Sequence, residues 1–220
     1  ALSSYTYYKG CRAWQCSDQG WALTSAGTVV IDSCWAINNG NMPFEGNVQT
    51  KGSGFKLWYA YDRYVDHAKT QVIMHNSIAT YNEFIGINLS DYNHAESPEL
   101  RSHIYNNFIY NNGLDAGKSN QWGFGLMDAG AHSDTTGRWD HWYWNNISYN
   151  NYNDHFWSSP NGDVLAGVFH QATNKWDIAG TTISNLDFVS LDTTGLCGPR
   201  QSDGSLPITT FGHLASTSEC

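Results

Sequence analysis

Asn107-Phe108-Ile109-Tyr110-Asn111-Asn112 is one copy of a six-residue unit that returns along the chain. The other copies begin at Cys11, Cys34, Ser77, Asn146 and Asn185, so successive starts are 23, 43, 30, 39 and 39 residues apart. The last position of the unit reads Cys16, Asn39, Asn82, Asn112, Asn151 and Ser190. A short strand and turn that return at uneven intervals indicate stacked coils joined by loops of variable length.

A second short strand follows each polar turn, and Gly54-Phe55-Lys56-Leu57 is one copy of it. Because side chains alternate between the two faces of a strand, one series points into the core and the other to solvent. We expect the inward series to be Trp21, Phe55, Ile87, Phe124 and Phe156, and the outward series Ala22, Lys56, Asn88, Gly125 and Trp157. Asparagines in the turn can bond one another across parallel strands about 4.8 Å apart. The pattern predicts an all-β, single-stranded, right-handed parallel β-helix with Asn39, Asn82, Asn112 and Asn151 in one column.

Composition and charge support one solenoid domain over residues 1–220, with residues 191–220 as a tail packed on the helix. Aromatic residues make up 15% of the chain and charged residues 14%, which is typical of a strand-and-turn protein. The net charge of −9 makes nucleic acid and anionic membranes poor partners. No apolar run approaches the ~18 residues of a membrane-spanning helix.

The five cysteines lack the C-x-x-C spacing of a zinc site. Cys197 and Cys220 bracket the tail and are a candidate disulfide. Cys11 and Cys34 fall at the same position of successive coils, so they are either bridged or stacked as reduced thiols. This cysteine usage and the start at Ala1, which fits a processed N-terminus, favour a secreted, extracellular protein.

Four phrases occur in an order that resembles the calcium-dependent pectate lyases of polysaccharide lyase family nine, which are right-handed parallel β-helices. They are Cys11-Arg12-Ala13-Trp14 with Ser17-Asp18-Gln19-Gly20-Trp21, then Val30-Ile31-Asp32-Ser33-Cys34-Trp35-Ala36 with Asn39-Gly40, then Gly52-Ser53-Gly54-Phe55-Lys56-Leu57, then Gly198-Pro199-Arg200-Gln201-Ser202-Asp203-Gly204-Ser205-Leu206-Pro207. The resemblance runs from about residue 8 to the tail. It implies cleavage of an acidic, uronate-containing polysaccharide by β-elimination.

The lysine of the Gly-Phe-Lys-Leu phrase is the Brønsted base in that family, so the resemblance implies this role for Lys56. β-Elimination needs a base for the proton beside a uronate carboxylate and a cation that neutralises the carboxylate. The family's calcium phrase, Ser-Asp-Asp-Gly-Trp-Asp, reads Ser17-Asp18-Gln19-Gly20-Trp21-Ala22 here, so Asp18 is its one remaining carboxylate. Calcium takes six to eight oxygen ligands, so we expect at most a weak site at Asp18. Asp32 and Glu45 are possible substitutes.

In a lyase, we expect Arg63, Asn88, Asp91 and Trp157 to line the substrate groove. The sequons at Asn88 and Asn146 are candidate glycosylation sites, and we favour Asn88 because we expect its side chain to face outward. The alternation of Trp139-Asp140-His141-Trp142-Tyr143-Trp144 places some of its rings on the outside. Those rings either stack on sugars or pack beneath a neighbouring loop.

A second hypothesis is a catalytically inactive β-helix, since part of the calcium phrase is missing. Such a module would assemble end to end or bind carbohydrate. Residues 1–8 contain three tyrosines and no charged side chain, and they resemble a strand rather than a cap. An uncovered strand edge is a template for pairing with another chain. Either an upstream segment that would cover this edge is missing, or a partner covers it, as in a homo-oligomer stacked end to end.

Overall fold

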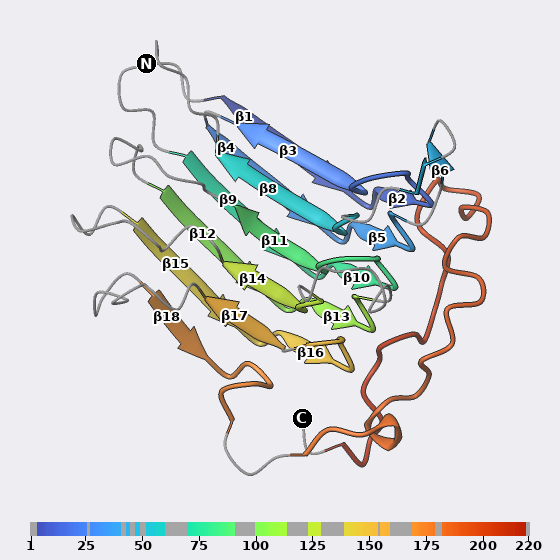
Figure 1. The fold of residues 1–220 in the computed structure, drawn as a ribbon. Coiled ribbons are helices and arrows are strands. Elements are labelled where there is room, and N and C mark those ends of the chain that lie inside the picture. Colours follow the sequence, from blue (N-terminus) through green and yellow to red (C-terminus); the bar gives the residue numbers. More distant parts are fainter. Residues whose placement is uncertain are drawn as a thin grey trace.

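The structure is a computed structural model that describes residues 4–25, 27–40, 43–44, 47–48, 52–59, 70–90, 100–113, 123–128, 139–153, 155–158, 169–178 and 182–218. Within these ranges, strands from successive coils pair in parallel into three sheets (Figure 1). Each complete coil adds one strand to each sheet, as the six-residue repeat predicts. The prediction of a parallel β-helix is confirmed.

The first sheet consists of β1 (Tyr5–Lys9), β4 (Thr28–Asp32), β9 (Thr70–His75), β12 (Leu100–Tyr105), β15 (Trp139–Trp144) and β18 (Phe169–Ala172). The second consists of β2 (Arg12–Trp14), β5 (Trp35–Ile37), β10 (Ile78–Thr80), β13 (Phe108–Tyr110) and β16 (Ile147–Tyr149). The third consists of β3 (Trp21–Ser25), β8 (Phe55–Tyr59), β11 (Ile87–Ser90), β14 (Leu126–Asp128) and β17 (Phe156–Ser158). A short antiparallel hairpin, β6 (Pro43–Phe44) and β7 (Asn47–Val48), is inserted between β5 and β8.

An asparagine ladder runs along the turn that follows the second sheet. The side-chain amides donate from Asn39 to Asn82, from Asn82 to Asn112 and from Asn112 to Asn151, over 2.8, 2.9 and 2.9 Å. The residue before each ladder asparagine has a positive φ between 51° and 56°, which turns the chain sharply: Asn38, Tyr81, Asn111 and Asn150. The predicted asparagine column is therefore confirmed.

A second ladder lies at the turn between the first and second sheets. Asn107 donates to Asn146 over 3.0 Å, and Asn146 donates to Asn174 over 2.8 Å. The sequence predicted Asn185 as the next member of this ladder, but Asn174 occupies that position instead. Asn185 begins a short 3₁₀ helix, η2 (Asn185–Asp187), so the last predicted repeat does not belong to the stack.

The core lies between the three sheets and is built from the inward side chains. Trp21 stacks on Phe55 at 5.7 Å between ring centroids, and Ile87 continues this column. The next residue in register is Leu126, not Phe124, so the predicted register of this strand is wrong by two residues. The outward partner of Asn88 is accordingly Met127 rather than Gly125.

The correct register follows from a column of glycines beside the first asparagine ladder. A Cβ on Gly54 would lie 2.6 Å from the Asn82 amide nitrogen, and one on Gly125 would lie 2.6 Å from that of Asn151. Only glycine fits between the ladder and the next strand. Gly125, rather than Gly123, is thus the equivalent of Gly54, and β14 begins immediately after it.

The C-terminal segment, residues 182–218, packs on the outer face of the second sheet, and Figure 1 shows it running beside that sheet. Phe188, Leu196 and Phe211 bury the outward aromatic rings of Trp35 and Phe108. At the first coil, the guanidinium of Arg12 on β2 donates to the carbonyl oxygens of Leu196 and Gly198 over 2.6 and 2.5 Å.

The strand β1 pairs with β4 in register from Tyr5↔Thr28 to Lys9↔Asp32. Tyr5 and Tyr7 are 67% and 49% exposed. Coverage of this edge by a partner, and with it the homo-oligomer, stays a prediction. No helix of the described residues is long and apolar enough to span a membrane.

Candidate active site

Lys56 occupies an outward position of β8 in the third sheet. Its neighbours in the chain, Phe55 and Leu57, are fully buried, and they fix the backbone on both sides of it. The Lys56 side chain is half-buried, with Ala22 in register on β3 and Asn88 in register on β11. The structure thus places the predicted base on the outer surface of a rigid strand, one strand spacing of about 4.8 Å from Asn88.

Asp18 lies in the turn between β2 and β3, and its electrostatic interaction with Lys56 places the two groups on the same side of the molecule. Burial raises the pKa of the Asp18 carboxyl, and the charge of Lys56 acts in the opposite direction. The side-chain amide of Gln19 donates to Asp18 Oδ1 over 2.6 Å. The charge of Lys56 thus stabilises the ionised form of the Asp18 carboxyl.

The described residues do not fit the calcium site that the resemblance implies. Among them, no group of three or more histidine, cysteine, aspartate or glutamate side chains could hold a metal ion. Asp18 supplies one carboxylate, already bonded to Gln19, whereas calcium takes six to eight oxygens. Glu45 lies outside the described residues, and Asp32 lies at the first sheet instead.

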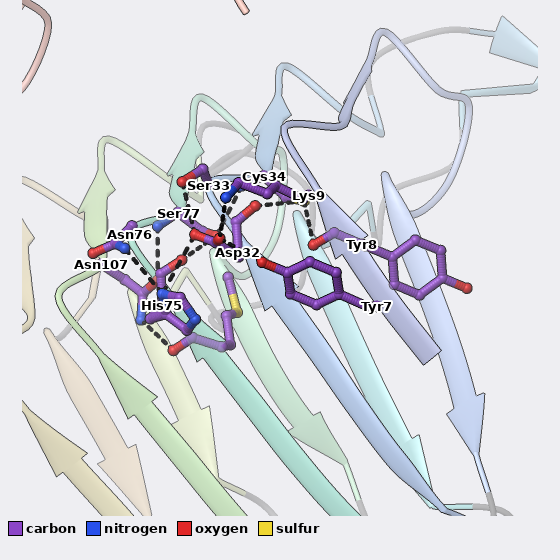
Figure 2. A network of polar contacts seen from close by, with 11 residues as sticks. Tyr7, Tyr8, Lys9, Asp32, Ser33, Cys34, His75, Asn76, Ser77 and Asn107 are labelled. Atoms are coloured by element: carbon purple, nitrogen blue, oxygen red, sulfur yellow. Dashed lines mark hydrogen bonds and ion pairs between the residues drawn. The ribbon is translucent and has the colours of Figure 1, made fainter. Parts of the chain in front are cut away.

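Asp32 belongs to a separate polar network on the outer face of the first sheet (Figure 2). Tyr7 donates its hydroxyl to Asp32 Oδ2 and Ser33 to Oδ1, each over 2.8 Å. Lys9 and His75 approach the same carboxylate at 3.5 and 3.4 Å. The Asp32 carboxylate is thus committed to neighbours on its own sheet, and the idea that it substitutes in a calcium site at Asp18 is wrong.

The other predicted groove residues are placed only in part. Arg63 and Asp91 lie outside the described residues. The backbone of Trp157 lies in β17, in register with Met127. Asn88 is aligned with Lys56 as predicted but is only 4% exposed, so the expectation of a solvent-facing side chain is wrong. This burial also removes the reason for favouring Asn88 as a glycosylation site, because a glycan needs open space around the amide.

A buried carboxylate close to Asp18 was not among the predicted site residues. Glu83 is 3% exposed and directly follows the ladder residue Asn82. Its carboxylate packs against Gly40, which in turn contacts Gly52, and a Cβ on Gly52 would lie 2.7 Å from the Asp18 carbonyl oxygen. The sequence did carry a signal for this carboxylate. A charged residue, Glu83, directly follows the ladder asparagine Asn82, whereas the equivalent position of the preceding coil is Gly40.

The described cysteines, Cys11, Cys16, Cys34 and Cys197, are free thiols. Cys11 and Cys34 are not bridged, so the alternative of stacked reduced thiols holds. Burial raises the pKa of the Cys34 thiol to about 11, which keeps it protonated and unreactive. Cys197 is an exposed free thiol, and its candidate partner, Cys220, lies outside the described residues.

Comparison with known proteins places this geometry in a family context. Residues 3–132 match the family described as "Pel9A-like, right handed beta helix region". The chain is 29% identical over 215 residues to Pectate lyase L of Dickeya chrysanthemi, and 29% identical over 219 residues to Pectate lyase L of Dickeya dadantii (strain 3937). Each alignment covers 96% of this chain and 42% of the relative, so the chain spans less than half the length of these proteins.

Two solved structures are similar in fold. The crystal structure of pectate lyase Pel9A superposes with a TM-score of 0.63 at 26% identity, covering 97% of this chain and 44% of that one. A rhamnogalacturonan lyase superposes with a TM-score of 0.59 at 22% identity, covering 96% of this chain and 47% of that one. The second likeness shows the fold alone.

Proposed function

Because the chain belongs to the Pel9A-like right-handed β-helix family, we propose that it is a secreted polysaccharide lyase, or the part of one that carries the base. Its substrate is a uronate-containing polysaccharide, which it cleaves by β-elimination. The observation that carries the proposal is Lys56, which belongs to the Gly-Phe-Lys-Leu phrase and lies on the outer surface of β8 beside Asn88. The relatives' names support the substrate class, and secretion rests on the sequence alone.

In this reaction the neutral amine of Lys56 takes the C5 proton of a uronate residue. The C5–H electrons form the C4–C5 double bond, and the O4–C4 bond breaks with its electron pair going to O4. O4 takes up a proton from water and leaves as the hydroxyl of the released polysaccharide. The product carries an unsaturated uronide at its new non-reducing end. A free lysine has a pKa of about 10.4, so the fraction of neutral amine, and with it the rate, increases with pH.

The direct test replaces the base. Lys56→Ala should abolish release of ultraviolet-absorbing uronides from polygalacturonate while leaving the far-ultraviolet circular dichroism unchanged. Lys9→Ala is the matched control, because Lys9 lies on the first sheet with a side chain 67% exposed, and it should retain full activity. Turnover by a folded Lys56→Ala protein would exclude Lys56 as the base.

A second variant separates two roles for Asp18. If Asp18 chiefly favours the ammonium form of Lys56, the neutral amine should form at lower pH in Asp18→Asn. The rising limb of the pH–rate profile should then shift to lower pH, and the variant should be faster than the parent at pH values below the parent's rising limb. If Asp18 instead helps to hold calcium, the same variant should lose activity and need more calcium. Rates measured from pH 7 to 10 with and without a chelator distinguish these outcomes.

The alternative function is a catalytically inactive β-helix module. Gln19 and Ala22 favour it, because they stand where the family's calcium phrase has carboxylates. A protein that releases no uronide from any polyuronate at any pH, with or without added calcium, would support this alternative over the lyase.

A further inference from the structure

The outer face of the first sheet carries a cluster of aromatic and histidine rings that the lyase proposal does not use. Register places His75, Tyr105 and Trp144 in one outward column, and His103, Trp142 and His170 in the next. None of these rings belongs to the buried clusters of the described core. Trp142 is 39% exposed, so solvent reaches this part of the sheet.

The first of these columns is a continuous ring stack with one ring on each strand. His75 stacks on Tyr105 at 4.9 Å between centroids and 11° between planes, and Tyr105 stacks on Trp144 at 4.6 Å and 2°. These spacings match the separation of about 4.8 Å between neighbouring strands. The next position, on β18, is Ala172, which supplies no ring. The stack therefore ends one strand before the sheet does.

A hollow of about 300 Å³ lies where that missing ring would be. Trp144 and Ala172 line it, together with Trp142 and His170, which stack on each other at 3.9 Å. This volume lies at the lower end of the range for small-molecule sites, about 300 to 1,000 Å³.

The walls of the hollow are held in place by Asp140. Trp142 Nε1 donates to Asp140 Oδ1 over 2.6 Å, and His170 Nε2 lies 3.3 Å from the same oxygen. Binding to such a site does not have to order these side chains, which lowers the cost of association. The described residues that line the hollow include no lysine or arginine.

We propose that this hollow binds a neutral sugar ring, which takes the place of the missing ring in the stack. A pyranose presents an apolar C–H face that can pack on Trp144, while its hydroxyls remain hydrated at the open side. A uronate is disfavoured because the described lining is almost wholly apolar and offers its carboxylate no arginine or lysine. The site lies on the first sheet, away from Lys56 on the third, and it does not depend on the lyase activity.

The test is a titration of the full chain with neutral β-linked hexasaccharides (cello-, manno- and galactohexaose) and with hexagalacturonate. The indole N–H signals of Trp142 and Trp144 are followed by NMR. At least one neutral hexasaccharide should shift these signals, and hexagalacturonate should bind at least tenfold more weakly or not at all.

Ala172→Trp should supply the missing ring and weaken the neutral-sugar affinity at least tenfold, whereas Ala172→Ser should retain it. Circular dichroism checks that both variants fold. The proposal is overturned if no neutral hexasaccharide shifts the indole signals, if hexagalacturonate binds as well as the neutral sugars, or if folded Ala172→Trp binds as the parent does. Trp144→Ala, which removes the wall on the other side, should lose binding to the same extent.

Discussion

At the scale of single residues, Asp32 shows how one carboxylate links three successive coils. Burial raises its pKa, but the hydrogen bonds from Tyr7 and Ser33, with His75 and Lys9 nearby, outweigh burial and leave the pKa below its ordinary value. A lowered pKa in the folded state means that the carboxylate stabilises the protein above its unfolded pKa. That stability is lost as the pH falls through the folded pKa.

We therefore predict that Asp32→Asn destabilises the protein at neutral pH and much less in acid. The expected loss in the free energy of unfolding is about 1–2 kcal/mol at pH 7, since charged hydrogen bonds are removed while the exposed Lys9 contributes little. The difference should shrink below a pH of about 4, where the unfolded carboxyl is protonated. Urea denaturation of both proteins across this pH range measures it.

A double-mutant comparison gives the control. Tyr7→Phe should destabilise the parent but change the Asp32→Asn protein little, because the hydroxyl has then lost its charged acceptor. Equal effects of Tyr7→Phe in the two backgrounds would contradict the coupling.

At the scale of structural elements, the asparagine ladder binds each coil to the next. Asn112 donates to Asn151 Oδ1 and to the Ala79 carbonyl oxygen over 2.9 and 3.1 Å, and its own side-chain oxygen accepts from Asn82. It is 1% exposed, so water cannot replace a lost partner. The strand pairing on both sides of the turn thus depends on this side chain.

Asn112→Ala should lower the free energy of unfolding by about 2–4 kcal/mol, because it leaves several buried polar groups without partners. Asn153→Ala is the matched control, since Asn153 is exposed in the turn two residues after the ladder residue Asn151 and should change stability by less than about 0.5 kcal/mol. Chemical denaturation followed by tryptophan fluorescence compares the two. Equal stability of both variants would show that the ladder is dispensable.

At the scale of the whole molecule, the C-terminal segment acts as a brace along the stack. Phe211 is 2% exposed and its ring packs against Phe108 and Tyr110 at 5.4 and 5.9 Å between centroids. Arg12 holds the segment at the first coil through two carbonyl oxygens. The brace therefore covers an outward face of the second sheet that is itself apolar.

Phe211→Ala should destabilise the protein by about 3 kcal/mol, near the lower end for a buried phenylalanine, because the segment can partly relax into the cavity. Cleavage of residues 182–218 by a protease should become faster in this variant. Ile208→Ala, at a side chain 86% exposed in the same segment, should leave both the stability and the cleavage rate unchanged. An unchanged cleavage rate in Phe211→Ala would argue against a bracing role.

Much of the fold could be predicted from the sequence because it is encoded in local repeats. The alternation of side chains along a strand and the asparagine at each turn depend on residues close together in the chain. They led to the parallel β-helix, to the column from Asn39 to Asn151, and to Lys56 on an outer face aligned with Asn88.

The misjudged features depend on contacts between distant segments. Gly123 and Gly125 are equally good turn residues locally, and only the crowding beside Asn151 selects Gly125. The burial of Asn88 likewise depends on distant residues, because residues of other segments surround its outward position. Asn185 matched the repeat locally, but Asn174 occupies its place because it reaches Asn146 on the neighbouring coil.

The sequence by itself determined the coil and its turns and predicted Lys56 as the base, because periodicity and short motifs are properties of neighbouring residues. Only the tertiary structure decided which side chains share a surface. It separated Asp32 from Lys56 by placing them on different sheets, and it brought Trp144, Ala172 and His170 together around one hollow. The physical reason is that loops of unequal length join the coils, so the register between strands is set by packing rather than by spacing in the chain.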